Sequence, residues 1–279
     1  MLLLALDTST RQASLALCSE DALYGEYTWL VGNNHSVELL DRVQRLLTEC
    51  NFTMPDLDAI AVATGPGSFN GVRVALATAK TLAFALKKPL IGMSTLDAIA
   101  AQQQHWRGPL CAALEAGRSE LYAACYMFDE HRDGSGDVSY SLKRLSEYLL
   151  LTPTQLATFI QEQVNTWVGI PGERQVPPSL FCGEISATSR QALQAELQEQ
   201  SLFVGSVQAA RHAWVLAMLA LQRLHAGDID DPLLLEPLYL RRPSITTSTR
   251  KQPLLGGRSL RPTPTGQSQT VREEGALRR

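Results

Sequence analysis

The sequence predicts an α/β protein in which mixed β-sheets are covered by helices. Three short strand-like runs at the start of the chain, residues 2–8, 13–20 and 22–30, are separated by links too short for a helix. Such links require antiparallel pairing. Two further apolar runs, 56–64 and 89–94, each follow a helical segment, so they join the sheet through crossover connections. The predicted order is therefore three strands, a helix, a strand, a helix and a strand.

The helices of this first unit have recognisable start signals. The first is predicted at residues 36–50, with Asn34 as a candidate N-cap because its side chain can accept a free backbone N–H. The second follows the loop at 63–73 and ends near Leu86, and the third covers 95–104.

A second unit is predicted from residue 108 onward. Residues 108–128 are predicted to form a β-hairpin around the turn at 117–119. Residues 129–150 are polar and then amphipathic, and no helix or strand is predicted for them. Further along, we expect helices at 152–163, 189–198 and 207–225 and short strands at 177–183 and 202–204. The sequence thus predicts an N-terminal subdomain at 1–107 and a C-terminal subdomain at 108–242.

Residues 243–279 differ in composition and charge from the rest of the chain. They consist mainly of Ser, Thr, Pro, Gly and Arg, which predicts a disordered tail. From Arg250 onward there are seven Lys or Arg against two Glu, so this part carries about +5 and the remainder about −8 of the net −3. We therefore expect the folded body to be acidic, with any direct RNA contact left to the tail or to a partner.

Cysteine usage and hydropathy predict a cytoplasmic protein. The five cysteines are scattered without a CxxC pair, which is typical of reduced thiols. The apolar start reaches an acidic residue at Asp7, too early for a signal peptide, and no apolar run is long enough to span a bilayer. We expect no membrane contact.

The loop ATGPGSFNGVR between a strand and a helix invites comparison with phosphate-binding loops. It is not a Walker loop, because no Lys follows Gly71, and it fails the GxGxxG pattern at Asn70. Its glycines permit a tight turn, and Ser68 can cap the following helix. An anion site and a plain tight connection both stay open. The candidate contacts for an anion or nucleotide are Asp7, Thr8, Gly65, Gly67, Ser68 and Gly71.

Two helices carry more apolar surface than one contact with a sheet can bury. In the second helix one apolar stripe is Val72, Leu76, Ala79 and Ala83, while Val74, Ala77, Thr81 and Ala85 lie elsewhere on its circumference. Such helices pack on each other within the chain or expose a surface to a partner, and both alternatives stay open. The candidate partner-facing residues are Val37, Leu40, Val43, Leu47, Val72, Leu76, Ala79 and Ala83.

The order of elements resembles the ribonuclease H-like half-unit of the actin-like ATPase (ASKHA) superfamily. The segments LALDTST, GPGSFNGVRVALATAK, LEAGRSELYAACY and EPLYLRR further resemble the bacterial TsaB family, from Leu2 to about Arg241. This resemblance implies two ribonuclease H-like subdomains and a non-catalytic, activating subunit. Such a subunit pairs with a TsaD-type catalytic protein in the complex that makes N6-threonylcarbamoyladenosine at position 37 of tRNAs. A TsaE-type ATPase belongs to the same complex.

The resemblance also says which chemistry to expect. TsaD-type proteins carry a HxxxH metal pair after the strand equivalent to 89–93, and Thr95 and Ile99 stand at those positions here. The resemblance therefore implies no catalytic residue, no metal and no cofactor of the chain's own, with tRNA reached through the complex. Whether ATP or ADP sits at the boundary with the partner, and whether the chain forms a homodimer when alone, stays open.

Two other classes of function are alternatives to this one, an ATPase or small-molecule kinase and a metalloprotease. An actin-like ATPase or small-molecule kinase would use Asp7 and the glycine loop, because aspartate at the end of the first strand helps to position Mg²⁺ and phosphate in catalytic relatives. The alternative role for Asp7 is to cap the turn at residues 8–10. A metalloprotease needs a metal site, and the sequence contains neither HExxH nor HxxxH.

Overall fold

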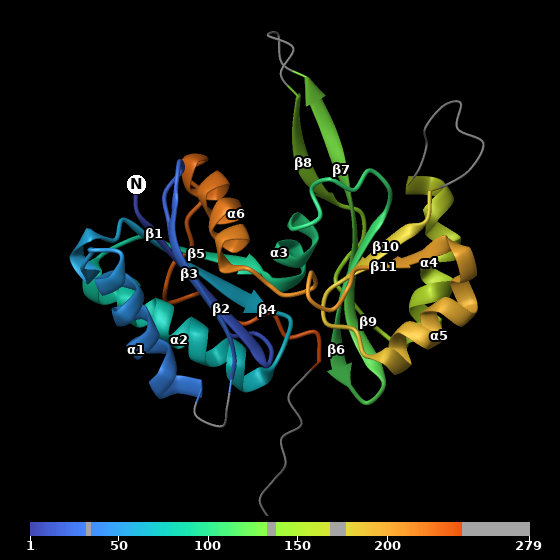
Figure 1. Ribbon diagram of the computed structural model, residues 1–279, viewed down its shortest axis with the longest axis horizontal. Helices are drawn as coiled ribbons and strands as arrows, with labels where there is room; N and C mark the ends of the chain where they lie inside the picture. The colour runs from blue at the N-terminus through green and yellow to red at the C-terminus, as the bar shows by residue number, and fades with distance from the viewer. Residues whose placement is uncertain (32–34, 133–137, 168–176, 242–279) are drawn as a thin grey trace, which may run out of the picture. The chain divides into compact units, whose positions relative to one another are not determined.

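The first sheet has five strands in the order β3-β2-β1-β4-β5 (Figure 1). The computed structural model describes residues 1–31, 35–132, 138–167 and 177–241, so Asn34 and the predicted tail lie outside the described residues. The strands are β1 (Leu3–Asp7), β2 (Gln12–Cys18), β3 (Leu23–Leu30), β4 (Ala59–Gly65) and β5 (Leu90–Ser94). β1, β2 and β3 pair antiparallel, and β4 and β5 join in parallel. This confirms the predicted order and its ribonuclease H-like topology.

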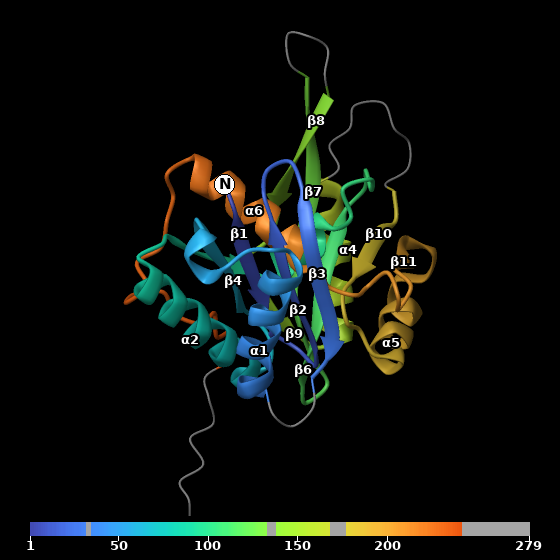
Figure 2. The same ribbon diagram turned by 60° about the vertical axis from the view of Figure 1, so that its left-hand side comes forward.

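Helices cover both faces of the first sheet (Figures 1 and 2). α1 (His35–Glu49) and α2 (Phe69–Leu86) pack on one face, where Leu4 and Leu6 of β1 lie. α6 (Ala213–His225) packs on the other face, against Leu3 and Ala5. Because β1 is buried on both sides, its sequence is continuously apolar instead of alternating.

The second sheet repeats this plan. Its order is β11-β10-β6-β7-β8, with β9 beside β7; β6, β7 and β8 pair antiparallel, and β10 and β11 join β6 in parallel. The strands are β6 (Leu110–Gly117), β7 (Glu120–Arg132), β8 (Val138–Arg144), β9 (Leu149–Leu151), β10 (Ser179–Cys182) and β11 (Ser201–Phe203). Gly117, Arg118 and Ser119 all have positive φ, so the tight turn lies where it is predicted.

Three more helices flank the second sheet. α4 (Pro153–Trp167) and α5 (Ala187–Leu197) cover one face, and α3 (Thr95–Ala101) packs on the other through Leu96 and Ile99. Short 3₁₀ turns lie at Met54–Asp56 and Gln198–Gln200. Since Ala98 of α3 contributes to the core of the first sheet, α3 lies between the two sheets.

The structure differs from the expectations in two places. β8 falls within 129–150 and β9 begins there, although no element is predicted for these residues; in β8, exposed Ser, Lys and Arg on an edge strand conceal the period of two, and β9 is a run of only three leucines. α6 begins at Ala213 and not at residue 207, and it packs on the first sheet. The boundary near residue 108 thus separates the two sheets, but the chain returns to the first sheet before it ends. Below, the first subdomain means the first sheet with α1, α2 and α6, and the second subdomain means the second sheet with α4 and α5.

Residues 228–241, here called the C-terminal strap, run beside β5 and then past the end of β4. The Asp230 carboxylate accepts a hydrogen bond from Gly92 N at 2.7 Å, and Leu238 N donates to Thr64 O at 2.8 Å. Arg241 then donates to Ala116 O of β6 at 3.0 Å. The strap therefore joins the first sheet to the β6–β7 hairpin of the second.

All five cysteines are free thiols, and four of them are buried. In the described part of the chain no helix combines the length and hydropathy that crossing a bilayer requires.

Candidate functional site

The glycine loop makes a sharp turn from β4 into α2. Gly65 has φ +101°, a conformation that side chains disfavour, and the Gly65–Pro66 peptide is cis. Ser68 is the N-cap of α2, and its Oγ accepts a hydrogen bond from Gly71 N at 3.3 Å. The predicted capping role of Ser68 is confirmed.

Gly67 and Gly71 leave no room for a side chain, because the β1–β2 turn packs directly on them. A Cβ at Gly67 would lie 2.1 Å from Ser9 O, and one at Gly71 would lie 2.0 Å from Thr8 O. Ser68 N donates to Ser9 O at 2.6 Å, and Thr8 Oγ1 donates to Gly71 O at 2.7 Å. The chain's own backbone thus fills the space beside Gly67 and Gly71, which favours the tight connection over the anion site.

Asp7 is buried, and its carboxylate is fully engaged within the protein. It accepts a hydrogen bond from Ser9 N at 2.8 Å, which is the predicted turn-capping role. It also accepts from Arg211 Nε at 2.8 Å, an ion pair with both side chains almost completely buried. Sequence reasoning missed Arg211, because it precedes an apolar helix in a stretch that reads as the start of that helix.

Arg211 joins Asp7 to a second carboxylate. Its Nη1 donates to Thr10 Oγ1 at 2.8 Å and to the Glu184 carboxylate, and its Nη2 donates to Gln12 O. Burial lowers the pKa of Arg211, but the two carboxylates outweigh burial and raise it above its ordinary value. The Asp7 carboxylate is therefore paired with a cation of the protein itself.

Six of the eight predicted partner-facing residues lie in the core of this chain, so their assignment to an exposed surface is wrong. Val43, Leu47, Val72, Leu76, Ala79 and Ala83 are all at most 4% exposed, and all but Val72 belong to the apolar core between α1, α2 and the first sheet. The apolar stripe of α2 faces the sheet because the sheet offers the larger apolar area. Leu40 is exposed, and the side chain of Val37 lies outside the described residues.

The other side of α2 forms an unusual surface, here called the outward face. Its exposed residues are Arg73, Ala77, Thr81, Phe84 and Ala85, with Leu40 of α1 exposed on the neighbouring helix. Most of these side chains are small, whereas the Phe84 ring is 79% exposed. A phenyl ring so exposed among small residues is typical of a surface that another protein covers.

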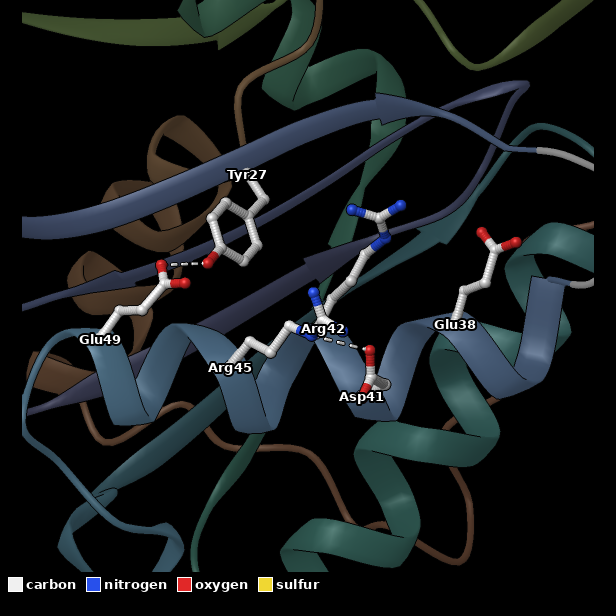
Figure 3. A pocket seen from close by; sticks show the side chains of 6 residues that line it. All are labelled: Tyr27, Glu38, Asp41, Arg42, Arg45 and Glu49. Atoms are coloured by element: carbon white, nitrogen blue, oxygen red, sulfur yellow. Dashed lines mark hydrogen bonds and ion pairs between the residues drawn. The ribbon is translucent and has the colours of Figure 1, made fainter.

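A polar depression lies between α1 and β3 (Figure 3). It is lined by Tyr27, Glu38, Asp41, Arg42, Arg45 and Glu49. The Tyr27 hydroxyl donates to Glu49, which raises the Tyr27 pKa, and Arg45 pairs with Asp41 at 3.1 Å. Arg42 lies over the Trp29 ring at 4.5 Å. The depression is charged and mostly paired internally, in contrast to the outward face.

The described residues hold no group of three or more His, Cys, Asp and Glu side chains arranged to bind a metal ion. Thr95 and Ile99, at the positions of the HxxxH pair, are both buried. Neither side chain is an ordinary transition-metal ligand.

A family model and several curated proteins that are similar to this chain all carry names from tRNA threonylcarbamoyladenosine synthesis. A family model described as TsaD, tRNA N6-adenosine threonylcarbamoyltransferase, matches residues 29–248. The tRNA threonylcarbamoyladenosine biosynthesis protein TsaB of Bacillus subtilis is 38% identical over 46% of this chain, and the chain spans 56% of that relative's length. The protein of the same name from Escherichia coli is 32% identical over 64% of this chain and 75% of its own length.

A solved structure agrees in fold. The structure described as YeaZ from Pseudomonas aeruginosa has a TM-score of 0.62 and is 26% identical, covering 86% of this chain and 99% of that one. The family model spans most of the chain, and the chain covers three quarters of the E. coli relative. The chain therefore belongs to the TsaB family, whose domain is related to TsaD.

Proposed function

We propose that this chain is the non-catalytic subunit of a tRNA N6-threonylcarbamoyladenosine synthesis complex. It binds a TsaD-type catalytic subunit through the outward face of α1 and α2. The tRNA-modification part of the proposal is supported by membership of the TsaB family. The binding part is carried by one observation, the 79% exposure of Phe84 on a helix face whose neighbouring exposed residues Ala77, Thr81 and Ala85 are small.

The chemistry of the outward face suits a partner helix. Ala77, Thr81 and Ala85 leave the α2 backbone accessible, so a second helix can approach closely. Phe84 supplies the large aromatic side chain that typically contributes most binding energy at the centre of an interface. Leu40 extends the apolar area onto α1. A TsaD-type protein has matching helices, so the two chains would form a four-helix contact.

The non-catalytic part of the proposal is supported by the environment of Asp7. An ATPase or small-molecule kinase, the alternative function, needs that carboxylate for a Mg²⁺–phosphate complex. Here it is buried and paired with Arg211. The loop glycines, which would have to approach a phosphate, contact Ser9 O and Thr8 O instead. The tRNA and the TsaE-type ATPase are reached through the complex.

Mixing the purified chain with a TsaD-type protein tests the proposal directly. We expect co-elution in gel filtration as a heterodimer, and threonylcarbamoyladenosine in tRNA only when the TsaD-type protein is present. Sedimentation of the chain alone measures whether it forms a homodimer, and repeating the mixture with ADP measures any nucleotide dependence. ATP turnover by the chain alone would favour the kinase or ATPase alternative, and separate elution under all conditions would refute the binding part.

A further inference from the structure

Arg211 is one of the most deeply buried charged residues in the described part of the chain, at 1% exposure. It lies between β11 and α6, outside any helix or strand. Each nitrogen of its guanidinium group donates a hydrogen bond within the protein. Pairing of every nitrogen is what a buried cation requires, because a nitrogen without an acceptor would lose its hydration without compensation.

The partners of Arg211 come from both subdomains. Asp7, Thr10 and Gln12 belong to the β1–β2 turn of the first sheet, whereas Glu184 follows β10 of the second. Thr10 Oγ1 also donates directly to the Glu184 carboxylate at 2.7 Å. One guanidinium group thus connects the end of β1 to the end of β10.

Glu184 is itself held on the second sheet. Its backbone O accepts a hydrogen bond from Glu115 N of β6 at 3.3 Å, and Ser186 N donates to the Glu115 carboxylate at 2.9 Å. A change at Arg211 would therefore act on anchored segments of both sheets. The planar fork of arginine matters, because the single ammonium nitrogen of Lys cannot reach the four acceptors that the three guanidinium nitrogens contact.

We propose that Arg211 fixes the two subdomains in a single arrangement, in place of the ligand-dependent closure that two-lobed proteins commonly use. The Arg211 cation bridges the β1–β2 turn and the β10–α5 segment without any ligand. Separation of the subdomains would break the bonds from Arg211 and Thr10 to Glu184 and leave the buried Arg211 cation with only one of its two carboxylates, which disfavours hinge opening. The outward face of α1 and α2 would then belong to a body with one conformation. This inference stands independently of the proposed function.

Coupling between Asp7 and Glu184 tests the bridge, because the two carboxylates lie in different subdomains and each binds Arg211. We would prepare Asp7→Asn, Glu184→Gln and the double variant in the full chain, each with and without Arg211→Met. Hydrogen exchange would be followed by mass spectrometry at the amides of Ser9 and Gln12, which are bonded to Asp7 and Thr10.

We expect a substitution in the second subdomain to change hydrogen exchange in the first subdomain. Glu184→Gln should speed exchange at Ser9 and Gln12 by about tenfold or more, since a charge-assisted hydrogen bond is lost. The effects of the two carboxylate variants should be non-additive with Arg211 present and additive in the Arg211→Met background. If Glu184→Gln changes exchange only in the second subdomain, or if additivity does not depend on Arg211, the bridge is refuted.

Two controls separate this role from general stability. Arg223→Met removes another arginine that pairs with two carboxylates, Asp228 and Asp230, both in the strap. It should change exchange in the strap and leave residues 183–186 unaffected. If Arg211→Met does not fold, the test rests on Glu184→Gln and Thr10→Val. A separate experiment then adds ethylguanidinium to Arg211→Gly, to replace the missing guanidinium group. Ethylguanidinium should restore slow exchange at Ser9, and ethylammonium should not.

Discussion

The ring of Tyr239 stacks on the ring of Phe69, with centroids 5.3 Å apart and an interplanar angle of 30°. Arg73 lies over the Phe69 ring at 4.1 Å, and its Nε donates to the Tyr239 hydroxyl at 3.0 Å. The end of the C-terminal strap is thereby held on the first turn of α2.

Removing this stack should release the strap without unfolding the sheets. Tyr239→Ala is expected to lower the free energy of unfolding by about 1–3 kcal/mol, from lost aromatic packing and apolar burial. Tyr239→Phe keeps the stack and loses one hydrogen bond, so it should cost only about 1 kcal/mol. Urea titration of both variants measures the difference. Equal losses would show that the stack itself contributes nothing.

The glycine loop predicts a graded response to alanine. Gly67→Ala and Gly71→Ala each place a Cβ about 2 Å from a backbone oxygen, so the β1–β2 turn must move. We expect each to cost on the order of 2–4 kcal/mol. Gly117 has φ +72° with no atom within 4 Å of an added Cβ, so Gly117→Ala should cost only about 1 kcal/mol of backbone strain. Thermal unfolding of the three variants checks the ranking; a Gly67→Ala protein as stable as Gly117→Ala would contradict it.

Two alanines of α2, two residues apart, should differ strongly in how well they tolerate the same substitution. Ala77 is exposed and Ala79 is fully buried, so Ala77→Glu should leave the fold intact whereas Ala79→Glu buries an unpaired charge. The latter should cost on the order of 3–5 kcal/mol. Circular dichroism and urea titration distinguish the two variants.

Binding to a TsaD-type protein should depend on the outward face. Ala77→Glu and Phe84→Glu are each expected to weaken the heterodimer at least about thirtyfold, because a charge replaces a central contact. Val207, which is 87% exposed before α6, supplies the matched control: Val207→Glu should bind normally. Calorimetric titration provides the dissociation constants. Normal binding by Phe84→Glu would place the partner on another surface.

Buried thiols should make the protein sensitive to high pH. Burial raises the pKa of Cys18 to about 11 and that of Cys182 to about 12, from an ordinary value of 9.0. Above pH 9 the unfolded chain therefore loses these protons while the native protein keeps them. Stability should fall as the pH rises above 9, by up to about 1.4 kcal/mol per pH unit for each thiol, until about pH 11 for Cys18 and about pH 12 for Cys182.

The slope of stability against pH isolates one thiol. Cys182→Ala should show a shallower decline between pH 9 and pH 11 than the unchanged protein, whatever its starting stability. Urea titration at a series of pH values measures both. An identical slope would mean that Cys182 ionises as readily in the fold as in the unfolded chain.

The first sheet was predictable because its strands have distinctive apolar runs and its links have diagnostic lengths. The Ser68 cap and the Asp7 turn followed from side-chain chemistry within a few residues. The partner face was misassigned because the helical spacing of apolar residues shows only that α2 has two apolar sides. It does not show which of the two sides packs on the sheet. Arg211 could not be found, since its partners Asp7 and Glu184 are brought to it only by the tertiary fold. β8 was not predicted, because its exposed side chains are mostly polar.

The return of α6 to the first sheet has a consequence for synthesis on the ribosome. β1 to β5 are complete at Ser94, yet the helix that covers their second face begins only at Ala213. Until that helix has emerged, Leu3, Ala5 and Ala61 lack the apolar residues of α6 on that side, where only Ala98 of α3 is already available. The N-terminal segment is therefore expected to wait in an incompletely folded state while the second sheet is made, so the two halves become native together.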